Sequence, residues 1–78
     1  MPTVLRTGPC RLYFSSHEPN EPPHVHVDRD SATAKYWLRP VSLAHNLGFP
    51  PHELARIERI VTRNQQRLTD DWYGFFVT

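Results

Sequence analysis

The chain has 78 residues and a formal net charge of +1, so no strong acidic or basic field dominates it and any electrostatic argument must be local. A chain of this size buries only about 60% of its unfolded surface, which predicts one domain with a thin core. No apolar run is long enough to span a bilayer, and the single Cys10 cannot form an internal disulfide. With no secretory leader at Met1, we expect a protein of the reducing cytoplasm.

The first predicted elements are two short strands. Val4–Thr7 and Cys10–Ser15 are rich in β-forming residues and flank Gly8-Pro9, which predicts a hairpin. The segment from Ser16 to Glu21 is polar and predicts a surface loop, the kind of segment in which binding residues concentrate.

The most chemically suggestive stretch follows this loop and reads Pro22-Pro23-His24-Val25-His26-Val27. Two prolines keep the chain extended, and the strict alternation after them is typical of a half-buried strand, here reaching about Arg29. Side chains alternate faces along a strand, so the two imidazoles are expected on one face, roughly 7 Å apart. The valines then point to the opposite face.

Two further strands are expected before the helical region. Ala32–Leu38 alternates after a turn at Asp30-Ser31, and Arg39-Pro40 then breaks the pattern. The segment Val41–Asn46 predicts a last strand, with a short helix as the alternative.

From Pro51 the apolar period changes to about 3.6 residues, which predicts a helix. Its apolar stripe consists of Leu54, Ile57, Val61, Leu68, Trp72 and Phe75. The polar run Asn64-Gln65-Gln66 interrupts this stripe, so one kinked helix and two consecutive helices are both open, and Gly74 is expected to mark the fraying end.

Strands followed by a helix predict an α+β fold in a single domain, residues 1–78, with the sheet in 1–46 and the helical part in 50–76. We expect an antiparallel sheet of about four or five strands with the helix on one face. The face under the helix should carry Leu12, Phe14, Val25, Val27, Ala34, Tyr36 and Leu38. The outer face should carry Arg11, Tyr13, His24, His26, Lys35 and Trp37.

Several motifs together resemble a known family. They are Met1-Pro2-Thr3, Gly8, Phe14-Ser15, Glu21-Pro22-Pro23-His24-Val25-His26-Val27, Ala34-Lys35, Trp37-Leu38 before Pro40-Val41, Gly48-Phe49, Glu53-Leu54, Ile57 and Trp72. Over essentially the whole chain they resemble a small bacterial family of unknown function, the one numbered four-one-six-zero. The resemblance implies a stand-alone bacterial protein whose gene often neighbours that of a second small family, a pair commonly labelled a toxin–antitoxin module. The chain departs from the family at Pro50, where a Ser or Asn helix cap is common, and at His17 and Pro19, where Asn and Gly are common.

Metal binding is one hypothesis for the histidine pair. His24 and His26 could offer two nitrogen ligands to a divalent ion such as Zn²⁺, with a third ligand from His17, Glu18 or Glu21. The alternative is that both histidines are surface residues of a solvated sheet face and bind no metal.

Acid–base chemistry is a second hypothesis. His24 and His26 could act as base and acid in metal-free RNA cleavage, with Lys35 and Arg11 as the phosphate-binding cations. Tyr13 or Trp37 could then stack on a base. The alternative is again an ordinary polar face.

A third feature is a row of arginines on the helix. Arg56, Arg59, Arg63 and Arg67 are spaced three or four residues apart and should share one helix face. This face could follow phosphates or dock an acidic partner. The alternative is a solvated surface whose charge Glu58 and Asp70 offset.

The resemblance implies a small protein of a toxin–antitoxin-type pair, and the features above indicate how it would bind. It would bind a protein encoded by a neighbouring gene, and also RNA or DNA, through the open sheet face and the arginine-lined helix. The alternatives are a ribonuclease-like toxin that uses His24 and His26, and a purely protein-interaction module anchored by Trp37 and Tyr13. The oligomeric state is left open.

Overall fold

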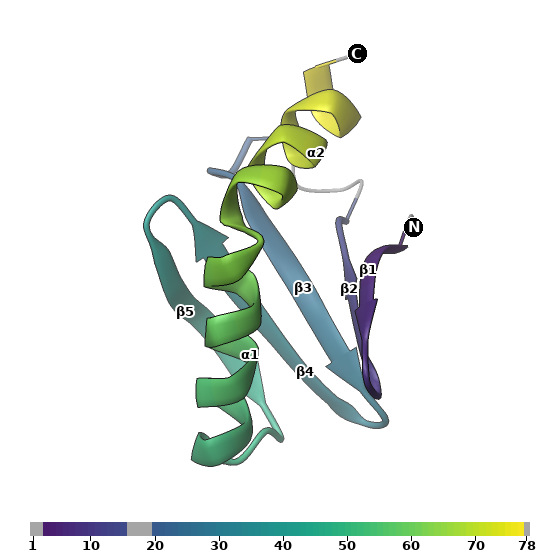
Figure 1. The fold of residues 1–78 in the computed structure, drawn as a ribbon, viewed down its shortest axis with the longest axis vertical. Coiled ribbons are helices and arrows are strands. Elements are labelled where there is room, and N and C mark those ends of the chain that lie inside the picture. The colour runs from purple at the N-terminus through teal and green to yellow at the C-terminus, as the bar shows by residue number, and fades with distance from the viewer. Residues whose placement is uncertain (1–2, 16–19, 78) are drawn as a thin grey trace.

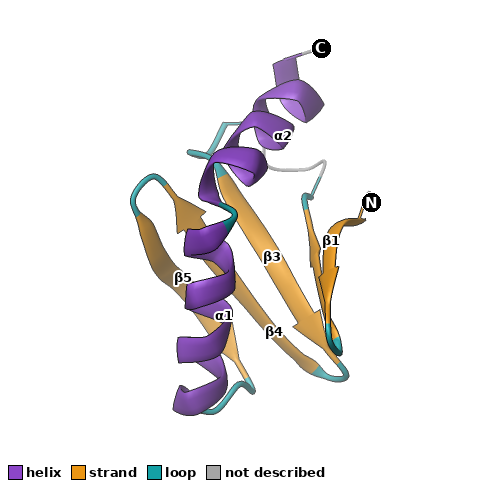
Figure 2. Cartoon of the chain, viewed as in Figure 1, coloured by secondary structure: helices purple, strands orange, loops and turns teal. Residues whose placement is uncertain are grey.

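The computed structural model describes residues 3–15 and 20–77 and contains one sheet and two helices in these ranges (Figures 1 and 2). The elements are β1 (Thr3–Thr7), β2 (Cys10–Tyr13), β3 (His24–Arg29), β4 (Ala32–Leu38), β5 (Val41–Leu47), α1 (Pro51–Arg63) and α2 (Gln65–Val77). The strands follow one another in the order β1-β2-β3-β4-β5, and every neighbouring pair is antiparallel. This architecture confirms the predicted α+β fold.

Tight turns connect most of the strands. Gly8 has a φ of 56° in the β1–β2 turn, a conformation that costs glycine little. Asp30 has a φ of 54° in the β3–β4 turn, where its short polar side chain is one of the few that tolerate the left-handed region. The segment Val41–Leu47 is a strand, so the alternative of a short helix is excluded.

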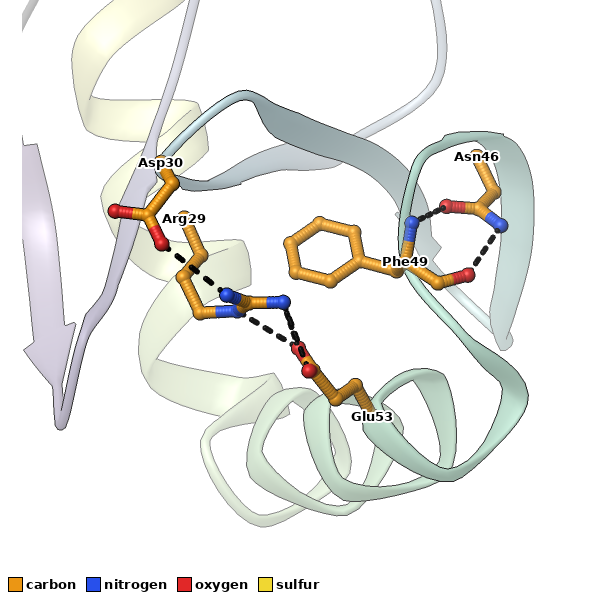
Figure 3. A network of polar contacts seen from close by, with 5 residues as sticks. All are labelled: Arg29, Asp30, Asn46, Phe49 and Glu53. Atoms are coloured by element: carbon orange, nitrogen blue, oxygen red, sulfur yellow. Dashed lines mark hydrogen bonds and ion pairs between the residues drawn. The ribbon is translucent and has the colours of Figure 1, made fainter.

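The connection from β5 to α1 depends on Gly48. Its φ is 100°, and a Cβ at this position would lie 3.3 Å from Ala32, so both the backbone conformation and the close approach require glycine. The Asn46 side chain bridges the turn, since it accepts from the Phe49 N–H at 3.1 Å and donates to the Phe49 carbonyl at 3.0 Å (Figure 3). Helix α1 then begins after Pro50, which provides no side-chain cap.

The helical region divides at Asn64. The side-chain amide of Asn64 donates a hydrogen bond of 2.8 Å to the Ile60 carbonyl. This side-chain bond competes with the backbone hydrogen bonds of the helix. The next side chain, Gln65, donates to the Leu38 carbonyl at 2.6 Å and ties the junction to the end of β4. Two consecutive helices result, and the second continues through Gly74 and ends at Val77, one residue beyond the predicted end of the helical part.

The core lies between the helices and one face of the sheet (Figure 1). All seven sheet residues predicted for this face are buried: Leu12, Phe14, Val25, Val27, Ala34, Tyr36 and Leu38. The Tyr36 hydroxyl also donates to the Leu54 carbonyl at 3.0 Å, which links β4 to α1.

Most of the predicted helical stripe is buried, but its last member is not. Ile57, Val61, Leu68 and Trp72 are buried, whereas Phe75 is 37% exposed. Phe76 packs against the core instead, with its ring 4.5 Å from that of Trp72. Leu68 and Trp72 of α2 follow the predicted stripe, so only its last position differs, and the Phe75 ring still lies 6.0 Å from that of Phe14. No helix in the described ranges is long and apolar enough to cross a membrane.

Candidate functional site

The candidate site is the sheet face opposite the helices. Strand pairing places Tyr13 beside His26, His26 beside Lys35, and His24 beside Trp37. The side chains of Arg11, Tyr13, His26, Lys35 and Trp37 are all half-buried. The register therefore brings together the six residues that the alternation predicted for this face.

Four of these side chains form a continuous row of rings, which we call the ring row: Tyr13, His26, His24 and Trp37. The Tyr13 and His26 rings are stacked, with centroids 5.3 Å apart and an interplanar angle of 19°. His24 meets His26 at 5.3 Å and Trp37 at 5.7 Å, in both cases edge to face. Ring pairs with such geometries contribute about 0.5–1.5 kcal/mol beyond the area they bury.

Cations brace both ends of the ring row. The Arg11 guanidinium lies 4.6 Å from the Tyr13 ring centroid, and the Lys35 ammonium lies 4.8 Å from that of Trp37. Lys35 also forms an ion pair with Glu21. The row is thus held in one arrangement from both sides.

Asp28 organises the polar contacts beside Tyr13. Its Oδ1 accepts from the Tyr13 hydroxyl at 3.1 Å and from the Thr33 hydroxyl at 2.7 Å. Partial burial of the phenol and the negative charge of Asp28 raise the pKa of Tyr13 above its ordinary value. Tyr13 therefore stays neutral at physiological pH and keeps donating to Asp28.

His24 differs from the expected solvent-facing imidazole, because its side chain is only 1% exposed. Its Nδ1 lies 2.8 Å from the Pro22 carbonyl, which can only accept, so Nδ1 donates this hydrogen bond. The Trp72 ring of α2 lies 6.4 Å away, where α2 passes the start of β3 (Figure 1). Both imidazoles lie at positions of the predicted face, but tertiary packing covers His24 and leaves His26 half-buried.

The burial of His24 weakens the acid–base hypothesis in its original form. A general acid or base must reach the group whose proton it transfers. In this conformation only His26, of the predicted pair, reaches the surface. Its neighbour Lys35 is already engaged by Glu21 and Trp37.

Within residues 3–15 and 20–77, no group of three or more His, Cys, Asp or Glu side chains is arranged to hold a metal ion. Two of the candidate third ligands, His17 and Glu18, lie outside the described residues, as does Pro19. The other, Glu21, pairs with Lys35. Metal binding by His24 and His26 stays a prediction from the sequence.

The helix break divides the predicted arginine row. Arg56, Arg59 and Arg63 are exposed on α1. Arg67 belongs to α2, where it donates to the Val4 carbonyl at 2.9 Å and lies 3.6 Å from Asp71. Arg67 therefore anchors the edge strand β1.

One polar contact was not predicted from the sequence. Arg29, at the end of β3, binds Glu53 of α1 through two hydrogen bonds of 2.7 and 2.8 Å (Figure 3). Glu53 lies in the first turn of α1, where a carboxylate also complements the positive end of the helix dipole. Nothing in the local pattern indicates a partner so distant in the chain.

The model of one family, described as "Domain of unknown function (DUF4160)", matches residues 10–73. The chain belongs to this family. The matched DUF4160 region includes the whole ring row and the arginines of both helices, whereas β1 lies outside it. No curated protein and no solved structure matched the chain.

Proposed function

We propose that this DUF4160 protein is a binding protein whose outer sheet face docks a partner protein. The partner would be the product of the neighbouring gene in a toxin–antitoxin-type pair. The observation that carries the proposal is the ring row with its two bracing cations, in which Tyr13, His26 and Trp37 are half-buried on the outer sheet face.

The composition of this face supports a protein interface. Tyr, Trp and Arg are the residues that most often dominate binding energy at such interfaces. Their mutual contacts also reduce the rotamer freedom that binding would otherwise remove. A partner would therefore meet a prearranged surface.

Single-stranded RNA is the second candidate, because aromatic and cationic side chains on an open sheet are also typical of RNA-binding proteins. Two observations favour the protein partner. The Tyr13 ring already contacts the Arg11 guanidinium and the His26 imidazole, so a stacking base must displace one of them. The Trp37 ring likewise contacts Lys35 and His24.

Burial of His24 supports a binding role over the ribonuclease-like alternative. The free Cys10 is compatible with a reducing compartment, and the cytoplasm is the compartment we propose.

Co-purification with the neighbouring gene product tests the proposal. We expect Tyr13→Ala and Trp37→Ala each to weaken the complex at least tenfold, as hot-spot truncations do. Tyr73→Ala is the matched control, because Tyr73 is a 45% exposed aromatic residue on α2. All variants should keep the parental circular dichroism spectrum.

The same variants separate the alternatives. Unchanged affinity of both outer-face variants for the neighbouring product would refute the proposal. If the outer-face variants keep their affinity for the neighbouring product but lose binding to single-stranded RNA, the RNA candidate would be favoured. Loss of growth arrest in a folded His26→Ala variant that still binds the partner would favour catalysis.

A further inference from the structure

A cavity of about 310 Å³ lies between the β1–β2 hairpin and α1, on the helix side of the sheet. Pro9 and Cys10 of the hairpin line it, together with Arg29 of β3 and Arg56, Ile57 and Ile60 of α1. None of these residues belongs to the ring row, so the cavity is a separate site. Its volume lies at the lower end of the range for small-molecule pockets.

The inner wall of the cavity is apolar. Ile57 is 2% exposed and Cys10 is 9% exposed, and Ile60 and Pro9 complete this wall. Burial raises the pKa of the Cys10 thiol, so the thiol is neutral at physiological pH and adds no charge. An apolar group would therefore be favoured against this wall.

Two of the charged groups at the cavity neutralise each other. Arg29 and Glu53 form a bidentate ion pair, and Arg29 also contacts Asp30 at 3.2 Å (Figure 3). The Arg29 guanidinium lies 5.5 Å from the Phe49 ring centroid, which fixes it further. This pair forms a neutral, ordered part of the lining.

Arg56 is the remaining cation. Its side chain is exposed, and it forms no hydrogen bond or ion pair with any other residue that the structure describes. Arg56 lines the cavity together with Cys10 and Ile57, so its guanidinium belongs to the same wall as these side chains. The cavity thus combines an apolar wall with one positive charge that lacks a carboxylate among the described residues.

We propose that this cavity binds a small organic carboxylate with a short apolar body. The apolar body would lie against Ile57, Ile60 and Pro9, and the carboxylate would bind the Arg56 guanidinium. A planar guanidinium matches a carboxylate with two parallel hydrogen bonds, which gives the site a preference for this anion over a neutral polar group.

Hexanoate is a suitable probe of the parent protein, with amide chemical shifts measured by ¹H–¹⁵N correlation spectra. We expect a saturable change at the amides of Cys10, Ile57 and Ile60. Acetate should bind at least tenfold more weakly, because it lacks the methylenes that would contact the apolar wall. Hexanol should also bind at least tenfold more weakly, because it lacks the charge.

Two variants locate the charge contact. Arg56→Gln should remove the preference for hexanoate over hexanol, while Arg59→Gln should keep it, because Arg59 is exposed on the same helix and does not line the cavity. Both positions are exposed, so both variants should fold. Equal binding of hexanoate and hexanol, shifts confined to other parts of the protein, or an unchanged preference in Arg56→Gln would each overturn the proposal.

Discussion

The two faces of the sheet are built from alternate residues of the same strands, yet they are stabilised in different ways. On the helix side, Leu12, Val25, Val27 and Leu38 are completely buried and interact through apolar area alone. On the outer side, the ring row is half-buried for most of its length and is held by stacking, cations and the Asp28 hydrogen bonds.

This difference separates stability from recognition. Apolar burial is the larger source of folding free energy, so the helix side should tolerate substitution poorly. The outer side contributes less to folding and keeps polar edges that a partner can contact. His24 is the exception, since it belongs to the ring row by register but is covered next to Trp72 of α2.

The largest expected effect distinguishes the two tryptophans. Trp72→Ala should lower the free energy of unfolding by about 3–5 kcal/mol, because the indole is buried in the core. Trp37→Ala should cost less, about 1–2 kcal/mol, because its half-buried ring loses one cation contact and one ring contact. Urea unfolding measures both values, and equal losses would contradict the division between the faces.

A smaller effect on the helix side depends on pH. Burial, and to a lesser degree Glu58, raise the pKa of Tyr36 to about 12 from an ordinary value of 10.0. The folded state therefore keeps a proton that the unfolded chain releases, and stability is fully present below pH 10. We expect about 2–3 kcal/mol to be lost as the pH rises from 10 through about 12.

Unfolding experiments across this pH range test the Tyr36 prediction. Tyr36→Phe should remove most of the pH dependence, although it also removes the hydrogen bond to Leu54. Tyr13→Phe should remove a further part, because the pKa of Tyr13 is raised as well. Tyr73→Phe is the control with an exposed phenol, and a Tyr36→Phe profile identical to that of the parent would refute the assignment.

The stacking on the outer face should have a modest energy. His26→Ala should cost about 1 kcal/mol through loss of its contacts with Tyr13 and His24. A double-mutant cycle with Tyr13→Ala isolates the Tyr13–His26 term, which should be about 0.5–1.5 kcal/mol. A coupling energy of zero would mean that the row is not prearranged by stacking.

The smallest effect on stability is expected on the solvent side of α1. Changing Arg59 and Arg63 together to Gln should alter the free energy of unfolding by no more than about 0.5 kcal/mol, because both side chains are exposed. If the protein binds nucleic acid through these arginines, the double variant should show a flatter salt dependence than the parent, because fewer counterions are released. Identical binding of both proteins across a salt titration would exclude these arginines as phosphate contacts.

The sequence by itself determined most of the elements and the division of residues between the sheet faces, but it left Val41–Asn46 open between a strand and a short helix. Alternation in His24–Arg29 and Ala32–Leu38 reproduces the bounds of β3 and β4, and the change of period at Pro51 coincides with the start of α1. These signals are local, because strand alternation and helical periodicity both depend on neighbours a few residues apart. The polar run at Asn64 likewise indicated an interruption but left a kink and two helices both open, and the structure has two helices, the first ending at Arg63 and the second beginning at Gln65.

Tertiary structure alone decided the features that join distant segments. His24 is buried next to Trp72, and Phe76 rather than Phe75 packs against the core. Arg29 pairs with Glu53 beside a cavity. Each of these outcomes depends on how the helices cross the sheet, and that geometry follows from packing between residues far apart in the chain. Helical periodicity and strand alternation predict which way a side chain points, but only the packed neighbours determine whether solvent reaches that side chain.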